Sequence, residues 1–296
     1  MTSEITLFVN PTAGRGRGAR AARPAASALR AAGFSVRTVL GTDAEDALAR
    51  ARVAVAEGTG ALIAVGGDGM ANLALRAVVG TGTPLGLVAV GTGNDFARAL
   101  GMPLREPAAA GRMIADALKC GRVRDVDLGR VGDRWFGTVL ASGFDSRVND
   151  RGNRMRLPAG RFRYDLAMVA ELAAFRPFPY RITLDGGDVR EVEATLVAVG
   201  NGPSYGGGMR ICPGADLTDG LLDVTVVGDC GRATLLRVFP TVYRGAHVGH
   251  PKVTVFRAAS VELAAEGVTG YADGEPAGPL PLTARCVRAA VRIVGP

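Results

Sequence analysis

Short β-branched and apolar runs alternate with longer helix-forming segments through residues 1–125. Strands are expected at Ile5–Asn10, Phe34–Leu40, Ala61–Val65 and Leu85–Val90. Helices are expected at Ala19–Ala32, from Thr42 or Asp43 to Glu57, at Ala71–Val79, from near Asp95, and at Pro107–Lys119. Because strands that alternate with helices form βαβ units, the pattern predicts an α/β domain with a doubly wound, mainly parallel sheet.

The pattern changes after Arg124, where strand-like runs are separated by Gly, Pro and Asp turns. The expected strands are Val126–Val131, Trp135–Ala141, Tyr180–Leu184, Val192–Val199, Leu222–Val227, Lys252–Phe256 and Ser260–Ala264, with one helix at Tyr164–Phe175. We therefore predict a second, β-rich domain at residues 126–286 and a cleft between the two domains. A last strand is expected at Val287–Val294, so that residues 287–296 can return to the first domain.

Composition excludes several classes of protein. Hydrophobic residues make up 48% of the 296 and charged residues 21%, which suits packed domains and excludes a disordered chain. Aromatic residues are only 5%, so a nucleic-acid binder that stacks bases on aromatic side chains is not expected. The net charge of +7 favours anionic partners such as nucleotides or acidic lipid head groups, although the excess of Arg over Lys also fits biased base composition.

The sequence predicts neither a signal peptide nor a membrane-spanning segment. The N-terminal MTSEITLFVNPTAG has no basic region or long apolar stretch, and no run of about 18 apolar residues occurs. The four cysteines form no C-x-x-C pair, which argues against a zinc site and a disulfide framework. We expect a soluble, cytoplasmic protein whose contact with membranes is peripheral.

A carboxylate between glycines follows the third expected strand, in Val65-Gly66-Gly67-Asp68-Gly69. Ligands of open α/β sheets bind at the carboxyl ends of strands, and glycines let a phosphate approach the backbone of a helix N-terminus. Asp68 would repel a phosphate directly, so we expect it to hold Mg²⁺ that bridges the carboxylate and the phosphates. The alternative is a plain glycine turn with a helix-capping Asp.

Two further glycine loops follow neighbouring strands. They are Gly91-Thr92-Gly93-Asn94-Asp95 and Asn10-Pro11-Thr12-Ala13-Gly14. Three such loops at one sheet edge favour a nucleotide-phosphate site over three unrelated turns. The Walker A motif and the protein-kinase motifs are absent, and a partial dinucleotide-binding fingerprint at Gly14-x-Gly16-x-x-Ala19 leaves the other two loops unexplained.

These motifs, with others downstream, resemble the diacylglycerol kinase catalytic family, which also includes sphingosine and ceramide kinases. The matching pieces, in the family's order across nearly the whole chain, are NPTAGRGRG, VGGDGMAN, GTGNDFAR, the GFD within Ser142 to Ser146, GNGPSYGGGM, PGADLTDGLLDV and YADGEP. GGDG is shared with NAD kinases, so the resemblance implies an NAD kinase-like first domain. GTGNDFA and DLTDGLLDV are more specific to the lipid kinases.

The resemblance implies that ATP binds in the cleft and that Mg²⁺ takes part. The expected ATP-site residues are Asn10, Pro11, Thr12, Ala13, Gly14, Thr42, Gly66, Gly67, Asp68, Gly69, Met70, Ala71, Asn72, Thr92, Asn94 and Asp95. It also implies a second, structural Mg²⁺ held by Asp216, Asp219 and the backbone carbonyl of Leu221, which suits a hard cation. An ordinary Asp-rich hairpin turn is the alternative there.

The catalytic base that the resemblance implies lies in Asp273-Gly274-Glu275. A lipid hydroxyl is a weak nucleophile until a carboxylate takes its proton, and either acid of this tripeptide can do so. Both remain candidates, with Asp68 as the residue that organises metal and phosphates. Met70 and Leu73 depart from the family, which usually has Thr and Glu at these positions, and this departure bears on the ATP contacts and on the acceptor.

A cluster of arginines with apolar residues between them extends from Arg147 to Arg163. It suits docking on an anionic lipid surface, and a solvated loop is the alternative. We predict an ATP- and Mg²⁺-dependent lipid kinase that acts on a diacylglycerol-like or sphingoid-like hydroxyl. The alternatives are a kinase of a soluble acceptor such as NAD, or a catalytically decayed lipid- or nucleotide-binding protein. A homodimer is left open.

Overall fold

The computed structural model describes residues 4–9, 17–143 and 177–296. Three sequence expectations fall outside these ranges, namely the loop of residues 10–14, the Arg147–Arg163 cluster and the helix expected at Tyr164–Phe175. None of the helices in the described ranges combines the length and apolar character needed to cross a bilayer.

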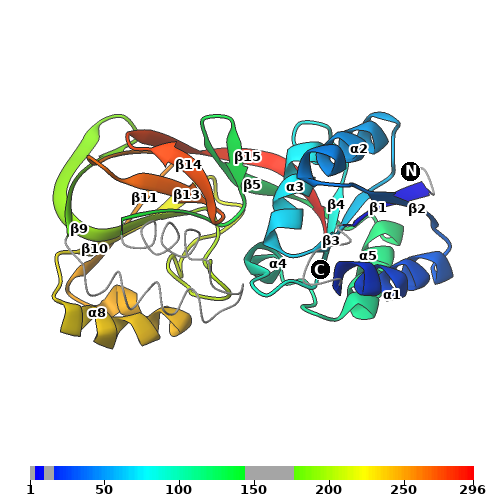
Figure 1. The fold of residues 1–296 in the computed structure, drawn as a ribbon, viewed down its shortest axis with the longest axis horizontal. Coiled ribbons are helices and arrows are strands. Elements are labelled where there is room, and N and C mark those ends of the chain that lie inside the picture. The colour runs from blue at the N-terminus through cyan, green and yellow to red at the C-terminus, as the bar shows by residue number, and fades with distance from the viewer. Residues whose placement is uncertain (1–3, 10–16, 144–176) are drawn as a thin grey trace.

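The first domain is a parallel sheet with helices on both faces (Figure 1). Its strands are β1 (Glu4–Val9), β2 (Ser35–Leu40), β3 (Leu62–Gly66) and β4 (Leu85–Ala89), in the order β2-β1-β3-β4. Its helices are α1 (Arg17–Ala31), α2 (Ala44–Ala56), α3 (Asp68–Val78), α4 (Asp95–Ala99) and α5 (Pro107–Lys119). All of these strand pairs are parallel, which confirms the predicted doubly wound sheet.

Alternating side chains divide the core of this domain between the two faces of the sheet. Phe8 and Leu62 pack with residues of α2 and α3, whereas Leu7 and Ile63 pack with residues of α1 and α5. Successive side chains of a strand point to opposite faces, so strands buried on both sides read as continuous apolar runs. This is why the runs at Ile5 and Ala61 predict interior strands.

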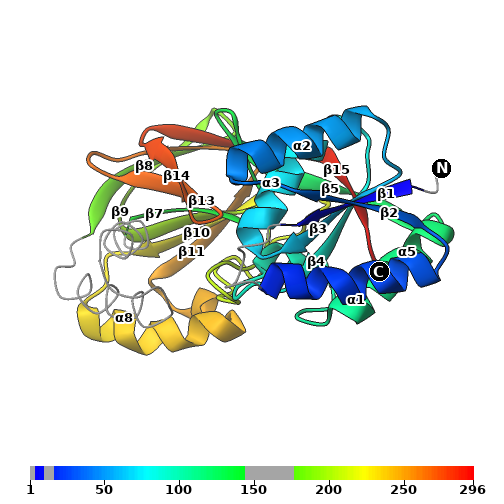
Figure 2. The ribbon, with the colours of Figure 1, turned by 45° about the vertical axis from the view of Figure 1, so that its right-hand side comes forward.

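The second domain is β-rich, as predicted, and its strands pair antiparallel. Its strands are β6 (Arg134–Phe136), β7 (Val139–Gly143), β8 (Phe178–Leu184), β9 (Asp188–Gly200), β10 (Leu222–Gly228), β11 (Val253–Ala258), β12 (Ser260–Ala264), β13 (Thr269–Ala272) and β14 (Glu275–Pro279). The sheet runs β14-β13-β7-β9-β8-β12, and β10 pairs with both β9 and β11. Figure 2 shows helix α8 (Arg232–Val238) along one edge of this domain, away from the first domain.

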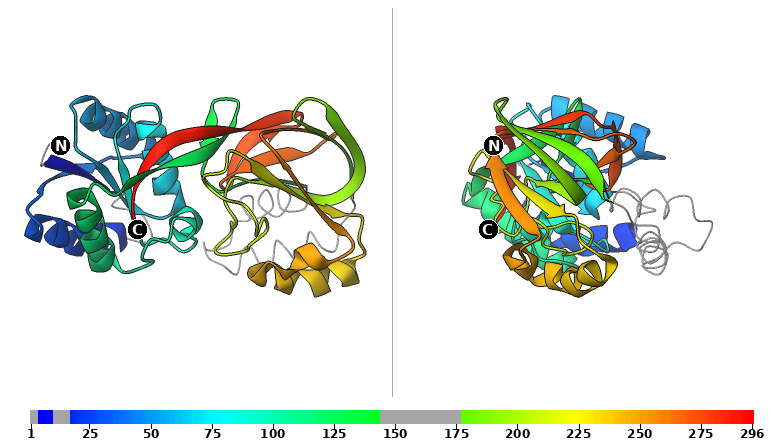
Figure 3. Two further views of the ribbon diagram at one scale, coloured as in Figure 1. Left: turned by 180° about the vertical axis from the view of Figure 1, so that it is seen from behind. Right: turned by 90° about the vertical axis from the view of Figure 1, so that its left-hand side faces the viewer.

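Two long strands connect the domains as an antiparallel ribbon. β5 (Val123–Val131) and β15 (Leu282–Val294) pair along most of their length, and β15 crosses between the domains in Figure 3. Near its end Ile293 pairs in parallel with Leu85 of β4, so β15 adds a strand to the first sheet. The division predicted at residues 125 and 126 falls inside β5 and stays a prediction.

Some elements differ from those expected. The single strand predicted at Trp135–Ala141 is two strands, β6 and β7, because the backbone of Gly137 and Thr138 donates hydrogen bonds to Asp273 instead of to a neighbouring strand. The β13–β14 hairpin and α8 were not predicted. The hairpin sequence TGYADGEPAGP is too rich in Gly and Pro to read as strands.

Candidate active site

The GGDG turn joins a buried strand to the N-terminus of a helix. β3 ends at Gly66, Gly67 has an extended N-cap backbone, and α3 begins at Asp68. A Cβ on Gly66 would lie 2.5 Å from the Cβ of Met70, and a Cβ on Gly91 would lie 2.5 Å from the Cα of Gly67. The two glycine loops therefore touch, and an approach this close requires glycine.

Asp68 holds the start of the next helix. Its Oδ2 accepts a hydrogen bond from the backbone N–H of Asn94 and its Oδ1 accepts one from Asp95, both at 2.7 Å. Asn94 has a left-handed backbone, with φ of 59°, which Asn tolerates better than most residues. Asp68 thus caps α4, the helix after the second loop, and its role in holding Mg²⁺ remains a prediction.

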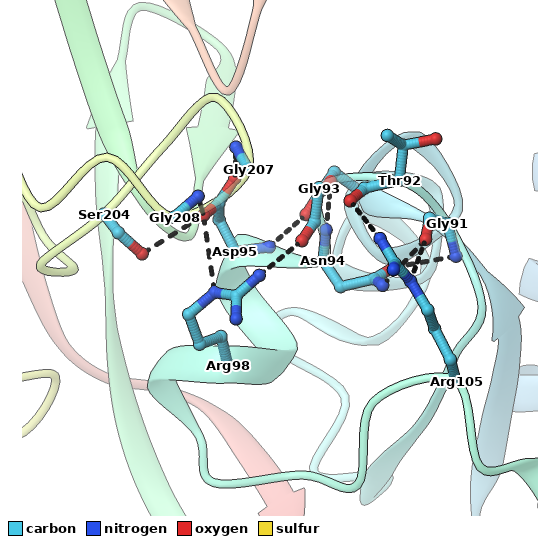
Figure 4. Close-up of polar contacts among 11 residues, drawn as sticks. Gly91, Thr92, Gly93, Asn94, Asp95, Arg98, Arg105, Ser204, Gly207 and Gly208 are labelled. Atoms are coloured by element: carbon cyan, nitrogen blue, oxygen red, sulfur yellow. Dashed lines mark hydrogen bonds and ion pairs between the residues drawn. The ribbon is translucent and has the colours of Figure 1, made fainter. Parts of the chain in front are cut away.

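Asp95 joins the first domain to the second (Figure 4). Its carboxylate accepts hydrogen bonds from the backbone N–H groups of Gly207 and Gly208, both at 2.7 Å, and from Ser204 Oγ at 3.2 Å. Both glycines have positive φ, which turns successive N–H groups toward one acceptor. Burial raises the pKa of Asp95, the nearby Asp68 raises it further, and the two glycine N–H groups oppose the rise.

Two arginines bind the carbonyl oxygens of the second glycine loop. Arg105 donates to the carbonyl oxygen of Thr92 at 2.9 Å, and Arg98 donates to that of Gly93 at 2.9 Å (Figure 4). Arg98 also lies 3.8 Å from a carboxylate oxygen of Asp95. Two guanidinium groups therefore lie beside the loop backbone, together with the carboxylates of Asp68 and Asp95.

The other predicted ATP-site residues have different surroundings. Gly69 and Thr92 are exposed. Met70 and Ala71 are buried in the core between α3 and the sheet. Asn72 donates from Nδ2 to the carbonyl oxygen of Trp135 at 3.2 Å, which is a second contact between the domains.

Thr42 lies at the end of β2, on the same sheet edge. Its backbone N–H and Oγ1 both donate to Asp46, at 2.9 and 3.2 Å. The backbone hydrogen bond from Thr42 lowers the pKa of Asp46, and Arg50 lowers it further. The structure thus brings Asp68, Thr92, Asn94 and Asp95 together, and the roles of all of these residues toward ATP remain predictions.

Asp273 is held by the turn between β6 and β7. Its carboxylate accepts hydrogen bonds from the backbone N–H of Gly137 at 2.7 Å, from the N–H and Oγ1 of Thr138 at 2.9 and 2.5 Å, and from the N–H of Val139 at 3.3 Å. Asp273 and Gly274 both have positive φ and form the two-residue loop of the β13–β14 hairpin, where Asp-Gly is a favoured pair. Burial raises the pKa of Asp273, and these hydrogen bonds oppose the rise. Glu275, two residues on, is exposed.

Asn201 supports the same turn from its other side. Its Nδ2 donates to the carbonyl oxygens of Asp127 and Gly137, at 2.9 and 3.0 Å, and its backbone N–H donates to the carbonyl oxygen of Thr138 at 2.8 Å. The peptide at Gly137 and Thr138 is therefore bound by Asn201 through its oxygens and by Asp273 through its nitrogens. Such a two-sided arrangement fixes the carboxylate of Asp273 relative to β5 and β9.

The Asp-rich turn at residues 216–221 is held by an arginine and a buried carboxylate. Asp219 forms an ion pair with Arg257, which also binds Asp223 at 2.9 Å. Asp127 accepts hydrogen bonds from the N–H groups of Gly220 and Ala289, both at 2.7 Å.

Within this turn Asp216 accepts hydrogen bonds from the N–H and Oγ1 of Thr218, at 2.9 and 2.7 Å, and Asp219 accepts one from the N–H of Leu221 at 2.9 Å. In the ranges that the structure describes, no three His, Cys, Asp or Glu side chains gather as a metal site. A site made of Asp216, Asp219 and the Leu221 carbonyl has only two such side chains, so this prediction remains open.

Sequence reasoning missed several residues that hold the site together. They are Asp127, Thr138, Asn201, Ser204, Gly207, Gly208 and Arg257. The run of glycines in GNGPSYGGGM was a visible signal for a backbone anion site, because consecutive glycines permit the conformation that turns N–H groups inward. Nothing in the sequence pairs Arg257 with Asp219, since their contact depends on the pairing of β10 with β11.

Comparison with known proteins agrees with this architecture. The model of the diacylglycerol kinase catalytic domain matches residues 4–131, and the model of the YegS C-terminal NAD kinase beta sandwich-like domain matches residues 138–295. A protein of Mycobacterium tuberculosis (strain ATCC 25618 / H37Rv) named diacylglycerol kinase is 45% identical over 298 residues, covering 99% of this chain and 95% of that protein. One of the same name from Bacillus subtilis (strain 168) is 30% identical, covering 93% and 90%.

Solved structures show the same fold at lower identity. A diacylglycerol kinase crystal structure from Bacillus anthracis str. Sterne superposes with a TM-score of 0.72 at 23% identity, covering 99% of this chain and 97% of that chain. An NAD kinase from Archaeoglobus fulgidus in complex with ATP superposes with a TM-score of 0.55 at 14% identity, covering 98% and 93%. Diacylglycerol kinases and NAD kinases thus share this fold, whereas the two relatives described above, at 45% and 30% sequence identity, are named diacylglycerol kinases. The chain belongs to the diacylglycerol kinase family and is a lipid kinase.

Proposed function

We propose that this chain transfers the γ-phosphate of ATP to the hydroxyl of a diacylglycerol-like lipid at the junction of its two domains. The relatives named diacylglycerol kinase support this acceptor. The observation that best supports a reaction centre at this junction is the contact between α4 and the turn that binds Asp273. Phe96, which follows Asp95 in α4, lies so close to Gly137 that a Cβ on this glycine would be 2.7 Å from the Phe96 ring. The backbone N–H of the same glycine donates a hydrogen bond to Asp273. This contact supports a single reaction centre that uses carboxylates of both domains.

The glycine loops fit the phosphates of a nucleotide. A Cβ on Gly69 would have nothing within 4 Å, so there is open space at the first turn of α3. The N-terminus of that helix favours an anion, and Arg98 and Arg105 add positive charge to the neighbouring loop. ATP supplies the phosphoryl group, and Mg²⁺ would offset its charge next to Asp68.

Asp273 is the base that we favour. Its raised pKa makes its carboxylate a better proton acceptor than an ordinary Asp, and its hydrogen bonds fix its orientation. In the proposed step the lipid O–H proton passes to Asp273 while the lipid oxygen bonds to the γ-phosphorus. The bond from that phosphorus to the β-phosphate oxygen breaks, which leaves ADP. Glu275, exposed at the start of β14, is the alternative base.

The remaining expectations are part of the same proposal. A diacylglycerol acceptor lies in a membrane, so a chain that works from the cytoplasm must bind the bilayer peripherally. The Asp216–Asp219 turn is kept as a structural Mg²⁺ site, in which Arg257 already offsets part of the negative charge. A soluble acceptor such as NAD is less favoured, because the likeness to NAD kinases is one of fold alone.

The test is phosphate transfer from γ-labelled ATP to diacylglycerol in mixed micelles with Mg²⁺. Loss of a general base lowers kcat by about 10²–10⁴, so we expect a fall of this size for Asp273→Asn and a fall below about tenfold for Glu275→Gln. The reverse ranking would make Glu275 the base. An absence of labelled lipid from the wild type, while ATP still binds, would overturn the proposal, and label in NADP from added NAD would favour the soluble acceptor.

A further inference from the structure

One stretch of the second domain carries cations without acids. From Cys230 to Val261 the sequence has no Asp or Glu, and it has Arg232, Arg237, Arg244, Lys252 and Arg257. The described ranges hold seven exposed large hydrophobic side chains, and four of them, Leu236, Tyr243, Val248 and Val255, lie in this stretch. Basic charge and exposed apolar side chains therefore coincide here.

The first half of this stretch forms a continuous helical stripe. α8 is followed directly by the 3-10 helix η1 (Phe239–Arg244), and Phe239 keeps a helical backbone with φ of −51° and ψ of −46°. Leu236, Phe239 and Tyr243 recur at helical spacing, and the rings of Phe239 and Tyr243 stack edge to face at 6.4 Å. No residue of α8 is buried, and Leu236 is 60% exposed. Leu236 and Tyr243 are thus exposed, with Phe239 half-buried between them.

The second half continues the same surface. The 3-10 helix η2 (Ala246–Gly249) contacts both η1 and β11, and within the described ranges β11 pairs only with β10. In Figures 1 and 2 α8 lies at the margin of the second domain, away from the first. Val255, on this edge strand, is 40% exposed.

Most of the cations on this surface are free of carboxylates. Arg257 is committed to Asp219 and Asp223. Arg232, Arg237, Arg244 and Lys252 are exposed, and none of them forms an ion pair with a described residue. These four cations produce a positive potential on a short surface segment, where the exposed Asp229 is a flanking acid.

The stripe is fixed to the loop that reaches the active site. Val242 is buried and its carbonyl oxygen accepts a hydrogen bond from the N–H of Arg210 at 3.1 Å, while His247 Nε2 lies 3.0 Å from the carbonyl oxygen of Ile211. The same loop carries Gly207, which binds Asp95. The segment is therefore attached through backbone contacts to the loop that binds Asp95.

We propose that this surface docks on an anionic lipid bilayer. We call it the basic helical face and define it by Arg232, Leu236, Arg237, Tyr243, Arg244, Val248, Lys252 and Val255. The cations complement anionic head groups, and the apolar side chains enter the interface below them. The choice of a bilayer as the partner rests on the proposed lipid-kinase function, and the surface itself differs from the Arg147–Arg163 cluster.

The experiment is sedimentation with vesicles, without ATP, so that binding is measured independently of turnover. Vesicles of phosphatidylcholine with phosphatidylglycerol are compared with vesicles of phosphatidylcholine alone. The triple variant Arg237→Gln/Arg244→Gln/Lys252→Gln should bind the anionic vesicles about a hundredfold more weakly, since each cation near such a surface contributes about fivefold. Binding by the wild type should weaken with added salt.

A matched control comes from α2, which presents Arg52 and Val53 side by side, both exposed. Leu236→Ala/Arg237→Gln should weaken vesicle binding at least about fivefold, and Val53→Ala/Arg52→Gln should leave it within about twofold of wild type. Thermal unfolding and phosphorylation of a water-soluble, short-chain diacylglycerol should be unchanged in the triple variant. These two readouts show that it is folded and that its reaction centre is intact.

The outcomes separate docking from catalysis. Wild-type binding that ignores anionic lipid, or a triple variant that binds like the wild type, overturns the docking surface even when short-chain diacylglycerol is phosphorylated. Loss of vesicle binding in the triple variant supports the docking surface even when no lipid is phosphorylated, in which case the proposed function fails alone. Equal losses in the α2 control overturn the assignment to this face.

Discussion

The hydroxyl of Thr138 offers a selective way to perturb Asp273. Thr138 Oγ1 donates to Asp273 Oδ1 at 2.5 Å, and Thr138 is 4% exposed. Thr138→Val removes this donor and keeps the shape of the side chain. A hydrogen bond to the charged form lowers a carboxyl pKa, so its loss must raise the pKa of Asp273 above the value that burial already sets.

The size of the effect follows from the kind of bond. A hydrogen bond to a charged group contributes about 1.5–3 kcal/mol, and one pKa unit corresponds to about 1.4 kcal/mol. We therefore expect the pKa of Asp273 to rise by about one to two units in Thr138→Val. A base must be deprotonated, so kcat falls as pH falls through this pKa, and the acid limb of the profile moves to higher pH in the variant.

The assay is kcat against pH at saturating ATP and diacylglycerol. Thr138→Ser keeps a hydroxyl donor and is the control, whose acid limb should lie close to that of the wild type. An acid limb that does not move in Thr138→Val would refute the reasoning, because Asp273 would then not be the group that titrates. Loss of the acid limb in Glu275→Gln instead would identify Glu275 as the titrating group.

Three further predictions concern Asp95, His247 and Arg257. Asp95→Asn turns an NH₂ group toward the N–H groups of Gly207 or Gly208, so the free energy of unfolding in urea should fall by about 2–3 kcal/mol, and an unchanged value would count against this contact between the domains. Burial lowers the pKa of His247. The neutral imidazole therefore contributes to stability above about pH 6.5, and this contribution is lost as the pH falls toward the folded-state pKa. The Tm of His247→Gln should accordingly depend less on pH than that of the wild type between about pH 7.5 and 5.5. Arg257→Met leaves Asp219 and Asp223 without their cation, so the free energy of unfolding should fall by on the order of 2 kcal/mol, between the values for exposed and buried ion pairs. If the Asp219 turn holds metal, Mg²⁺ should raise the Tm of this variant more than that of the wild type.

The sequence predicts the first domain better than the second, for a physical reason. Strands buried on both faces read as apolar runs, and their connecting helices have their own periodicity, so both are visible locally. The split of Trp135–Ala141 depends on Asp273, more than 130 residues away along the chain. No local pattern contains that partner, and the same holds for the return of β15 to β4.

In the site too, residues placed by local patterns were predicted, and residues placed by long-range contacts were not. Asp68 and Asp95 were predicted together because their loops follow adjacent strands of a parallel sheet, which forces them to one edge. Met70 was predicted as an ATP-site residue, and its side chain is buried in the core, because Gly66 leaves room for it against the strand. Its role toward ATP stays a prediction. Asn201 has no such positional signal, since its contacts lie on β5 and on the turn between β6 and β7, which only the fold brings together.

The carboxylates predicted in the site also hold distant parts of the backbone in place. Asp68 binds the N–H groups at the start of α4, Asp95 binds those of the glycine loop in the second domain, and Asp273 binds those between β6 and β7. Each carboxylate is thus fixed before any substrate binds, so a role in the reaction would need no further ordering of these groups. Because an Asn replacement removes an acceptor oxygen as well as the charge, loss of activity in Asp→Asn variants combines a change of chemistry with a change of position. Thr138→Val and Ser204→Ala each remove one donor and leave the carboxylate, so these variants separate the two effects.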